Sequence, residues 1–595
     1  MSTENIINRR RFVSLSSGLV ASFPASSALL KPSNNSDGQV PQENLMERFT
    51  LDLGHRATRS GPVANLDDNS LLWVTTEPEP PYLAKAMWPI SRLVVRRSKD
   101  GGKSWGESQI LQQGTSDYSL LSHVLRQSTS GKILHIFVRY SGYDYETGTP
   151  EKSLCKIYFQ TSNDRGQTWS KAQALVTGER YHGDILSIEQ LSSGRWIYPI
   201  CFLTNIKSQF AVSVMVSDDD GETWERSESI LTAGGAGFES GASEPTVCEL
   251  NSGVLWMLIR AQTGFLWESF SYNQGQTWTT AIPSQLPSSN APATGLKLRN
   301  GDIAIVWNNH IDSNYARKSL VIGLTADGKN FKGLREIDFA DFRDDLAITR
   351  QHVTYPYLTE MKDGTIIVSY NKGNWGLHNQ PTLARINPAW ITTKHELINF
   401  QDGRTDWHII CPGPNYSHAV ERYVSLDDKL WLEIEQHPKS KAVTGIIRNI
   451  PLLSNGKIQI TAQIPKADAY ILIANSLLSP RKPDEGCVRI RFTDMGVYFA
   501  TGKANRSRND RKITEYLYTS FQIREEIQFP DSINNEKTLN ISVEYKSDEN
   551  EVRIQINNST PISLKTEKFM GLSYMGFLVD NGGQIRIQQI ETSST

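Results

Sequence analysis

The chain has 595 residues, more than one ordinary domain holds, so we expect at least two domains. Hydrophobic residues make up 38% of the sequence, charged residues 21%, and the formal net charge is only −2. This balance is typical of a soluble globular protein. It gives no electrostatic reason to expect a nucleic-acid partner or binding to an anionic membrane surface.

The first forty residues predict an export signal rather than part of the fold. Arg9, Arg10 and Arg11 precede Phe12 and a mildly apolar stretch, residues 13–30, that is rich in Ser and Ala. The stretch is too short and too polar to span a membrane, so no membrane span is predicted. A basic start followed by a weakly apolar region is typical of a signal peptide, and the paired arginines resemble a twin-arginine signal. We expect a protein exported to the periplasm or secreted; a basic tail without this role is the alternative.

Residues 45–400 carry two short patterns that alternate along the chain. The first pattern is an apolar residue, a polar turn that usually contains glycine, and an apolar β-rich run. Its copies begin at Leu66, Gln127, Leu191, Leu250, Leu298 and Met361. Each copy predicts a tight turn between two strands. The copies recur every roughly 50 to 60 residues, which is the length of a four-stranded propeller blade.

The second pattern resembles an Asp box, Ser-x-Asp-x-Gly-x-Thr-Trp. Four good copies lie at residues 98–105, 162–169, 217–224 and 271–278, and a degenerate copy lies at 325–331. The Asp or Asn side chain can accept backbone N–H groups in the turn, glycine supplies the left-handed position, and Trp packs back into the blade. We therefore expect these carboxylates to be structural and not catalytic.

The two patterns together predict an all-β chain with a six-bladed β-propeller at residues 45–400. Both patterns then stop, and residues 405–595 alternate apolar and polar positions, as at 430–434 and 552–556. This alternation predicts an antiparallel β-sandwich as an accessory domain. The repeats resemble those of the sialidase superfamily, in which a lectin-like sandwich commonly accompanies a propeller. A sugar-binding role and a purely structural role for this sandwich both stay open.

Polar side chains mark the start of the innermost strand in four of the six predicted blades. These are Arg59 in the first blade, Asp184 in the third, Glu244 in the fourth and Tyr355 in the sixth. The innermost strands of a propeller line its central mouth, so these four side chains are expected to converge there. Converging polar groups of catalytic type predict a site.

The resemblance to sialidases implies a role for each of these positions. Residues 59–62, Arg-Ser-Gly-Pro, resemble the family's Phe-Arg-Ile-Pro, which makes Arg59 the first of three arginines that bind the substrate carboxylate. Arg260, sixteen positions after Glu244, and Arg317 resemble the second and third. Tyr355 resembles the nucleophile and Glu244 its base. Rim charges would be the ordinary role of the two later arginines, and Tyr357 is the alternative to Tyr355 in the same register.

The chemistry implied is release of a terminal sialic acid, or a related 2-keto sugar acid, by a retaining exo-α-sialidase-like hydrolase without a cofactor. Three guanidiniums would hold the carboxylate on the anomeric carbon. A carboxylate nucleophile would be repelled by that group, whereas a neutral tyrosine hydroxyl is not. A phenol has a pKa near 10, so it needs a base, the role implied for Glu244.

The family's general acid has no counterpart in the expected place. Sialidases carry an Asp after the first hairpin of blade one, but residues 77–92 contain none. Glu79 lies on that loop, and Asp184 lies in the ring of inner-strand starts. The general acid is therefore Glu79, Asp184 or neither, with a solvated loop charge and a sugar-hydroxyl contact as their respective ordinary roles.

Two other functions compete with a sialidase. A propeller glycosidase for a uronic or neutral sugar could use Glu244 and Asp184 as its two carboxylates, and a non-catalytic propeller could bind carbohydrate. The arginine triad favours an acidic glycan as the partner. The histidines lack ligand spacing and the five cysteines are scattered, so neither a metal site nor a disulfide framework is predicted. The oligomeric state is left open.

Overall fold

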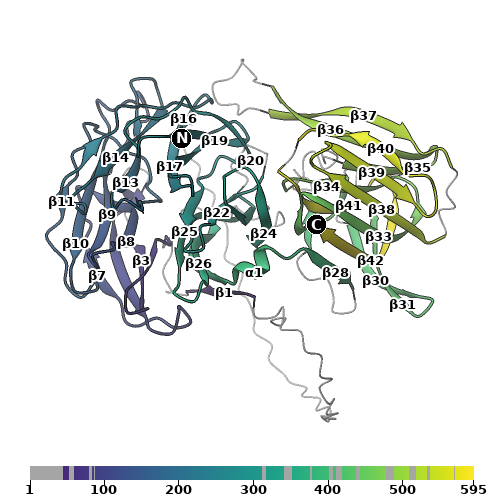
Figure 1. Cartoon of the computed structure of the whole chain (residues 1–595), viewed down its shortest axis with the longest axis horizontal. Coiled ribbons are helices and arrows are strands. Elements are labelled where there is room, and N and C mark those ends of the chain that lie inside the picture. The colour runs from purple at the N-terminus through teal and green to yellow at the C-terminus, as the bar shows by residue number, and fades with distance from the viewer. Residues whose placement is uncertain are drawn as a thin grey trace, which may run out of the picture. The chain divides into compact units, whose positions relative to one another are not determined.

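The computed structural model (Figure 1) describes most of the chain from residue 45 onward. The described ranges are 45–51, 59–79, 84–85, 88–310, 317–340, 351–374, 378–400, 407–410, 419–436, 443–477, 488–507, 518–531, 537–568 and 570–594. The predicted export signal, residues 1–40, lies outside the described residues.

Six antiparallel sheets, each built on a row of four strands, make the predicted six-bladed propeller (Figure 1). Blades one to three contain β2 (Val63–Asn65), β3 (Leu71–Pro78), β6 (Ser91–Ser98) and β7 (Gln109–Gln112); β8 (Ser119–Gln127), β9 (Ile133–Gly142), β10 (Leu154–Ser162) and β11 (Gln173–Ala174); and β12 (Glu189–Gln190), β13 (Trp196–Leu203), β14 (Gln209–Ser217) and β15 (Glu225–Arg226). Blades four to six contain β17 (Ser243–Glu249), β18 (Leu255–Arg260), β19 (Phe265–Ser271) and β20 (Ile282–Pro287); β21 (Thr294–Lys297), β22 (Ile303–Asn308), β23 (Ser319–Thr325) and β24 (Phe331–Phe339); and β25 (Gln351–Glu360), β26 (Ile366–Asn374), β27 (His378–Ile386) and β1 (Met46–Thr50). The all-β prediction and the blade count are confirmed.

The last blade takes its outer strand from the beginning of the fold. β1 pairs antiparallel with β27, with Met46 opposite Ile386 and Thr50 opposite Thr382. The other five blades are each built from one continuous stretch of chain. The ring is therefore closed by backbone hydrogen bonds between its first and last segments, which leaves no open sheet edge at the join.

The first repeated pattern forms the turn between the first and second strand of each blade. Glycine occupies the left-handed position in most copies, as at Gly194, where φ is 90°. A Cβ there would meet nothing within 4 Å, so the backbone conformation alone requires glycine. In the first copy Asn69 adopts the left-handed conformation instead, with φ 66°. The turns therefore form where the pattern predicts them.

The Asp boxes form the turns between the third and fourth strands. In blades two and three Asp164 and Asp219 each accept the backbone N–H four residues later, from Thr168 and Thr223, at 2.9 Å. Asn273 accepts the equivalent N–H in blade four at 3.0 Å. Hydrogen bonds from Thr168 lower the pKa of Asp164 to about 2. The predicted structural role of these side chains agrees with their contacts.

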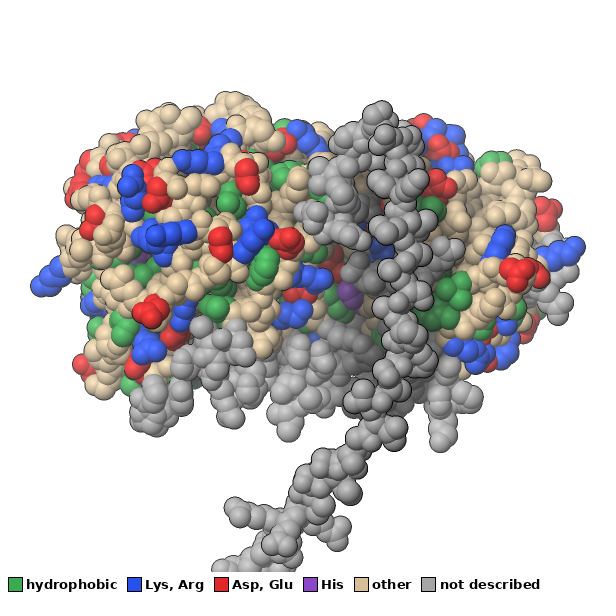
Figure 2. Space-filling model, turned by 90° about the horizontal axis from the view of Figure 1, so that it is seen from below, with side chains coloured by type: hydrophobic (Ala, Val, Ile, Leu, Met, Phe, Trp, Pro, Cys, Tyr) green, Lys and Arg blue, Asp and Glu red, His purple; other side chains and the backbone are tan. Residues whose placement is uncertain are grey.

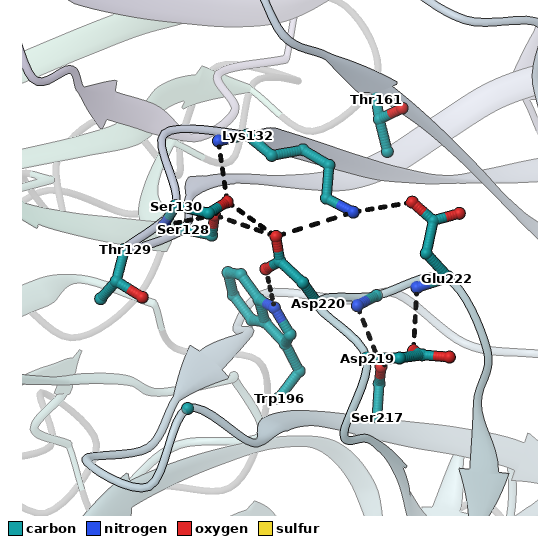
Figure 3. A network of polar contacts seen from close by, with 12 residues as sticks. Ser128, Thr129, Ser130, Lys132, Thr161, Trp196, Ser217, Asp219, Asp220 and Glu222 are labelled. Atoms are coloured by element: carbon teal, nitrogen blue, oxygen red, sulfur yellow. Dashed lines mark hydrogen bonds and ion pairs between the residues drawn. The ribbon is translucent and has the colours of Figure 1, made fainter.

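Polar contacts between neighbouring blades join the two kinds of turn (Figure 3). Asp220, in the third box, accepts the indole N–H of Trp196 at 3.0 Å and the Ser130 hydroxyl of blade two at 2.7 Å. Lys132 of the same blade-two turn donates to Glu222 of the box at 2.8 Å. Each Asp box can therefore order its own blade and also hold the preceding one.

Two further sheets form the predicted β-sandwich (Figure 1). One contains β28 (His395–Asn399), β30 (Ala419–Leu426), β31 (Lys429–Gln436), β33 (Asn455–Lys466), β38 (Leu539–Lys546), β39 (Glu551–Ile556), β40 (Ile562–Lys565) and β42 (Gln584–Ser594). The other contains β29 (His408–Ile410), β32 (Thr444–Leu453), β34 (Ala469–Ala474), β35 (Val488–Thr493), β36 (Gly496–Ser507), β37 (Tyr518–Gln528) and β41 (Leu572–Val579). Buried side chains from both sheets of the sandwich, such as Ile460, Ile471 and Phe577, form one apolar cluster with residues of blades four and five, including Trp307.

The remaining described elements are short. They are β4 (Ala84–Lys85), β5 (Trp88–Pro89), β16 (Ser240–Gly241) and α1 (Pro388–Ile391). Among the described residues, no helix has the length and apolar character needed to cross a membrane. Figure 2 shows blue and red side chains intermixed over the described surface of one face, in keeping with the small net charge.

Candidate active site

Glu244 and Tyr355 occupy matching irregularities in two inner strands. The β17–β18 register shifts between Ser243 and Thr246, and the β25–β26 register shifts between Thr354 and Tyr357. Both side chains stand at left-handed backbone positions, with φ 41° for Glu244 and 56° for Tyr355. A bulge re-aims a side chain, and such a conformation costs on the order of 1–3 kcal/mol for a non-glycine residue.

A proline follows each of the two bulged residues. Pro245 and Pro356 have no backbone N–H, so neither can donate the ladder hydrogen bond that the bulge omits. Proline also restricts the residue before it to extended conformations, which the left-handed Glu244 and Tyr355 do not adopt. The fold therefore holds both side chains in strained backbone positions, and such positions cluster at functional sites.

The two side chains meet in a buried hydrogen bond. The Tyr355 hydroxyl donates to Oε1 of Glu244 at 2.9 Å, and Nη1 of Arg260 donates to Oε2 at 2.7 Å. Burial raises the pKa of Glu244, with Arg260 acting in the opposite direction. Burial, and then Glu244, raise the pKa of Tyr355 well above its usual value. Tyr355 is therefore a neutral donor in this state, and its acceptor is a carboxylate with increased basicity.

Arg59 and Asp184 form an ion pair beside the tyrosine. Nη2 of Arg59 lies 2.8 Å from Oδ2 of Asp184, and the Arg59 guanidinium carbon lies 5.0 Å from the centre of the Tyr355 ring. A backbone hydrogen bond from the Arg59 N–H to the Thr76 carbonyl oxygen at 2.9 Å fixes the arginine to β3. Blades one, three and six thus contribute to one polar group.

Asn290 holds the other two arginines. Its side-chain Oδ1 accepts Nε of Arg260 at 2.7 Å, and its backbone oxygen accepts Nη2 of Arg317 at 2.9 Å. The Arg317 guanidinium carbon lies 5.3 Å from the centre of the Tyr355 ring. Arg317 follows the segment 311–316, which is outside the described residues. One buried asparagine therefore sets the separation of Arg260 and Arg317.

The structure brings together six of the seven residues singled out from the sequence. Direct contacts connect Arg59, Asp184, Glu244, Arg260, Arg317 and Tyr355. The seventh residue, Glu79, pairs instead with Arg92, whose Nε lies 3.3 Å from Oε1 of Glu79. Tyr357, the alternative to Tyr355, lines a cavity of about 240 Å³ among the inner strands, and burial raises the pKa of its hydroxyl.

Sequence reasoning missed Glu239 and Asn290. Nη2 of Arg260 forms an ion pair with Oε2 of Glu239 at 2.9 Å. Glu239 follows a glycine-rich connection, and Asn290 precedes the inner strand of blade five. A signal for Asn290 exists in principle, because its place before β21 resembles that of Asp184 before β12. For Glu239 we find none.

Gly61 shows how the arginine motif departs from the family's Phe-Arg-Ile-Pro. A Cβ at Gly61 would lie 2.3 Å from Cε1 of His123 and 2.4 Å from the backbone oxygen of Val74. His123 is buried, and burial lowers the pKa of its imidazole well below the usual range. A neutral histidine thus occupies the space beside Arg59 that a larger residue at position 61 would need.

The described residues offer no cluster of three or more His, Cys, Asp or Glu side chains that could hold a metal ion. The polar group is built instead from three arginines, three carboxylates and one tyrosine. Such a set can bind an anion, move a proton between a phenol and a carboxylate, and form a covalent bond through the phenol oxygen.

Six blades, five of which carry an Asp-box turn, define an Asp-box β-propeller. A family model described as a BNR repeat-like domain matches residues 90–368. The chain is 24% identical over 287 residues to an anhydrosialidase of Macrobdella decora, a match that covers 45% of this chain and 36% of that protein. It is 24% identical over 218 residues to a sialidase of Paraclostridium sordellii, covering 33% of this chain and 52% of that protein.

A solved structure of a Streptococcus pneumoniae sialidase mutant is also similar, with 16% identity and a TM-score of 0.45 over 59% of this chain and 72% of that one. The chain matches about a third of the length of the first curated relative and about half of the second. The repeat match, the two curated relatives and the six-bladed fold support a sialidase-like superfamily for this chain.

Proposed function

We propose that this protein is an exo-acting, retaining glycoside hydrolase that releases a terminal sialic acid or a related 2-keto sugar acid. The hydrogen bond from the Tyr355 hydroxyl to Glu244, at 2.9 Å and buried beside three arginines, carries the proposal. The relatives named above, an anhydrosialidase and a sialidase, support the same reaction class.

The reaction begins with proton transfer from the Tyr355 hydroxyl to Glu244 as the phenol oxygen attacks the anomeric carbon. The bond from that carbon to the leaving oxygen breaks, and a general acid protonates this oxygen. Water then attacks the anomeric carbon of the tyrosyl–sugar intermediate. The former acid takes a proton from the water, and the departing Tyr355 oxygen recovers its own from Glu244. Two displacements at one carbon retain its configuration.

The arginines supply the binding energy and select the charge of the sugar. The guanidinium groups of Arg59 and Arg317 both lie over the Tyr355 ring, so an anionic group bound by both would lie next to the nucleophile. Guanidinium groups bind carboxylates through charge-assisted hydrogen bonds. A tyrosine nucleophile adds no second negative charge before the reaction, which a carboxylate nucleophile would.

Asp184 is the general acid in this proposal, and Glu79 is not. Asp184 contacts Arg59, which lies over the Tyr355 ring, whereas Glu79 is bound to Arg92. A substrate carboxylate that binds Arg59 takes this guanidinium from Asp184 and leaves the Asp184 carboxyl group available to the leaving oxygen.

A glycosidase for a uronic or neutral sugar is the second candidate. It is favoured by the presence of Asp184 together with Glu244, because two carboxylates are enough for general acid–base chemistry on such a sugar. The nature of the nucleophile separates the two candidates, since only the first requires the Tyr355 oxygen to form a bond.

The test is release of the fluorophore from 4-methylumbelliferyl N-acetylneuraminate by the full chain and by Tyr355→Phe. We expect turnover in the wild type and a loss of at least about 10³-fold in the variant, which keeps the ring and removes only the hydroxyl. Equal turnover in both would contradict the tyrosine mechanism. If the folded wild type releases nothing, 2-keto acid and uronide glycosides form the next substrate panel, and activity confined to a uronide supports the second candidate.

A further inference from the structure

Arg260 uses all three of its nitrogens within the protein. Nε donates to Asn290 at 2.7 Å, Nη1 to Glu244 at 2.7 Å and Nη2 to Glu239 at 2.9 Å. The Arg260 side chain is only 2% exposed, whereas that of Glu239 is 30% exposed. Glu239 therefore presents the solvent-accessible side of this contact. A ligand carboxylate that is to reach Nη2 must first displace the Glu239 carboxylate.

The backbone around Glu239 is conformationally unusual. Glu239 has φ 54°, and Gly235 and Gly237 before it have φ 132° and 89°. A non-glycine residue in the left-handed region is strained, so the surrounding structure must hold it there. β16 begins at the next residue and pairs with β14, which fixes the chain immediately after Glu239. The Glu239 carboxylate is thus held next to Arg260 by a specific backbone geometry.

The residue before Glu239 is fixed on its other side. The backbone oxygen of Phe238 accepts Nε2 of Gln262 at 2.6 Å, and the Phe238 ring lies 5.8 Å from that of Tyr143 in a T-shaped contact. With both neighbours held, rotation of the Glu239 side chain is enough to separate it from Arg260. No movement of the loop is needed.

A buried guanidinium nitrogen without an acceptor is costly, and Glu239 supplies the acceptor for Nη2 of Arg260 while the site is empty. A carboxylate on the sugar can replace Glu239 at no loss of pairing, because it brings the same charge and the same acceptor geometry. A neutral sugar brings neither. We propose that Glu239 is a specificity-determining residue that occupies Arg260 in the empty site and yields it to the carboxylate of the substrate. This inference rests on the proposed function.

The test compares binding of free N-acetylneuraminate with binding of its uncharged methyl ester by titration calorimetry on the full chain. Glu239→Gln keeps the shape and removes the charge that competes for Arg260. We expect it to bind the free acid about tenfold more tightly than the wild type, or about 1.4 kcal/mol, with the ester unchanged. Glu179→Gln is the matched control. Its carboxylate pairs with Arg226 at 2.7 Å in blade three, with a similar exposure, and should change neither affinity.

Loss of a negative charge could also raise the affinity for an anion without any displacement. An Arg260→Lys background distinguishes the two cases. If displacement from Arg260 is the cause, the gain from Glu239→Gln disappears in that background; a gain that persists overturns the proposal. Unchanged or weaker acid binding in Glu239→Gln overturns it as well. If neither the wild type nor Glu239→Gln binds any acidic sugar, the proposed substrate class fails and the role of Glu239 fails with it.

Discussion

The carboxylates of the Asp boxes and the Glu244 carboxylate at the centre of the ring lie in opposite environments. Asp164 and Asp219 lie in exposed turns and accept backbone N–H groups at 2.9 Å. Glu244 lies buried between a phenol and a guanidinium. Hydrogen bonds to Thr168 lower the pKa of Asp164 to about 2, whereas burial raises the pKa of Glu244.

The contrast teaches that the number of acidic residues says little about where chemistry occurs. An Asp box stabilises the ionised form and so removes its carboxylate from proton transfer. A desolvated carboxylate with one phenol donor keeps its basicity. In this chain the acids that the sequence pattern marks most clearly are the structural ones, and Glu244, the central candidate, lies at a bulge outside the Asp boxes.

The largest expected effect tests the central carboxylate. Glu244→Gln removes the base while keeping a hydrogen-bond acceptor for Tyr355, so we expect turnover to fall about 10³-fold with the fold unchanged. In the wild type kcat/KM should fall as the pH drops through the raised pKa of Glu244, because the base must be ionised. A pH–rate profile on the sialoside checks both. A flat acidic limb in an active wild type would contradict this role.

A comparison of Asp184→Asn with Glu79→Gln tests which carboxylate belongs to the centre. We expect about a 10²-fold loss of turnover for Asp184→Asn, since it cannot protonate the leaving oxygen. Glu79→Gln should change turnover less than twofold, because this carboxylate contacts Arg92 and not the central group. The steady-state rates of both variants on the sialoside decide between them. The reverse order would move the general acid to the loop of blade one.

The packing beside Arg59 can be tested through Gly61. Gly61→Ala places a Cβ 2.3 Å from His123 and 2.4 Å from a backbone oxygen, so we expect a loss of stability of about 1–3 kcal/mol. Denaturant unfolding measures it. Gly106→Ala is the control, because a Cβ there meets only the Arg97 oxygen at 3.5 Å. Equal stability of the two variants would show that the space at Gly61 is not restricted.

The smallest expected effect tests the carboxylate of one Asp box. Asp219→Ala should lower stability near pH 7 by about 1 kcal/mol, and Asp219→Asn by less, because Asn273 serves the same turn in blade four. Burial opposes the shift, yet hydrogen bonds to Thr223 lower the pKa of Asp219 to about 2. Its contribution is therefore present above pH 4 and is lost as the pH falls toward 2. Unfolding curves at pH 7 and pH 2 should show the difference between wild type and Asp219→Ala shrinking in acid.

The sequence predicts the blades well because each turn is local. Glycine or asparagine at a fixed offset, and an Asp or Asn four residues before its N–H donor, determine the turn without help from distant residues. The convergence of Arg59, Asp184, Glu244 and Tyr355 was predictable from their common place in the repeat. The contacts of Arg260 with Glu239 and Asn290 were not, because they depend on one left-handed backbone position and on the spacing between two blades.

The closing strand, residues 46–50, was also not predictable, because its few residues lack a repeated pattern. It has a consequence for the order of folding. Its partner, residues 378–386, is the last propeller strand in the chain, so the contacts that close the ring have a very large sequence separation. Closing so long a loop costs chain entropy that only complete blades can offset. Arg59 lies in the first blade and Tyr355 in the last, on the two sides of this closure. We therefore expect the individual blades to form before the central group of side chains is assembled. Activity should then appear only in the final kinetic phase of refolding.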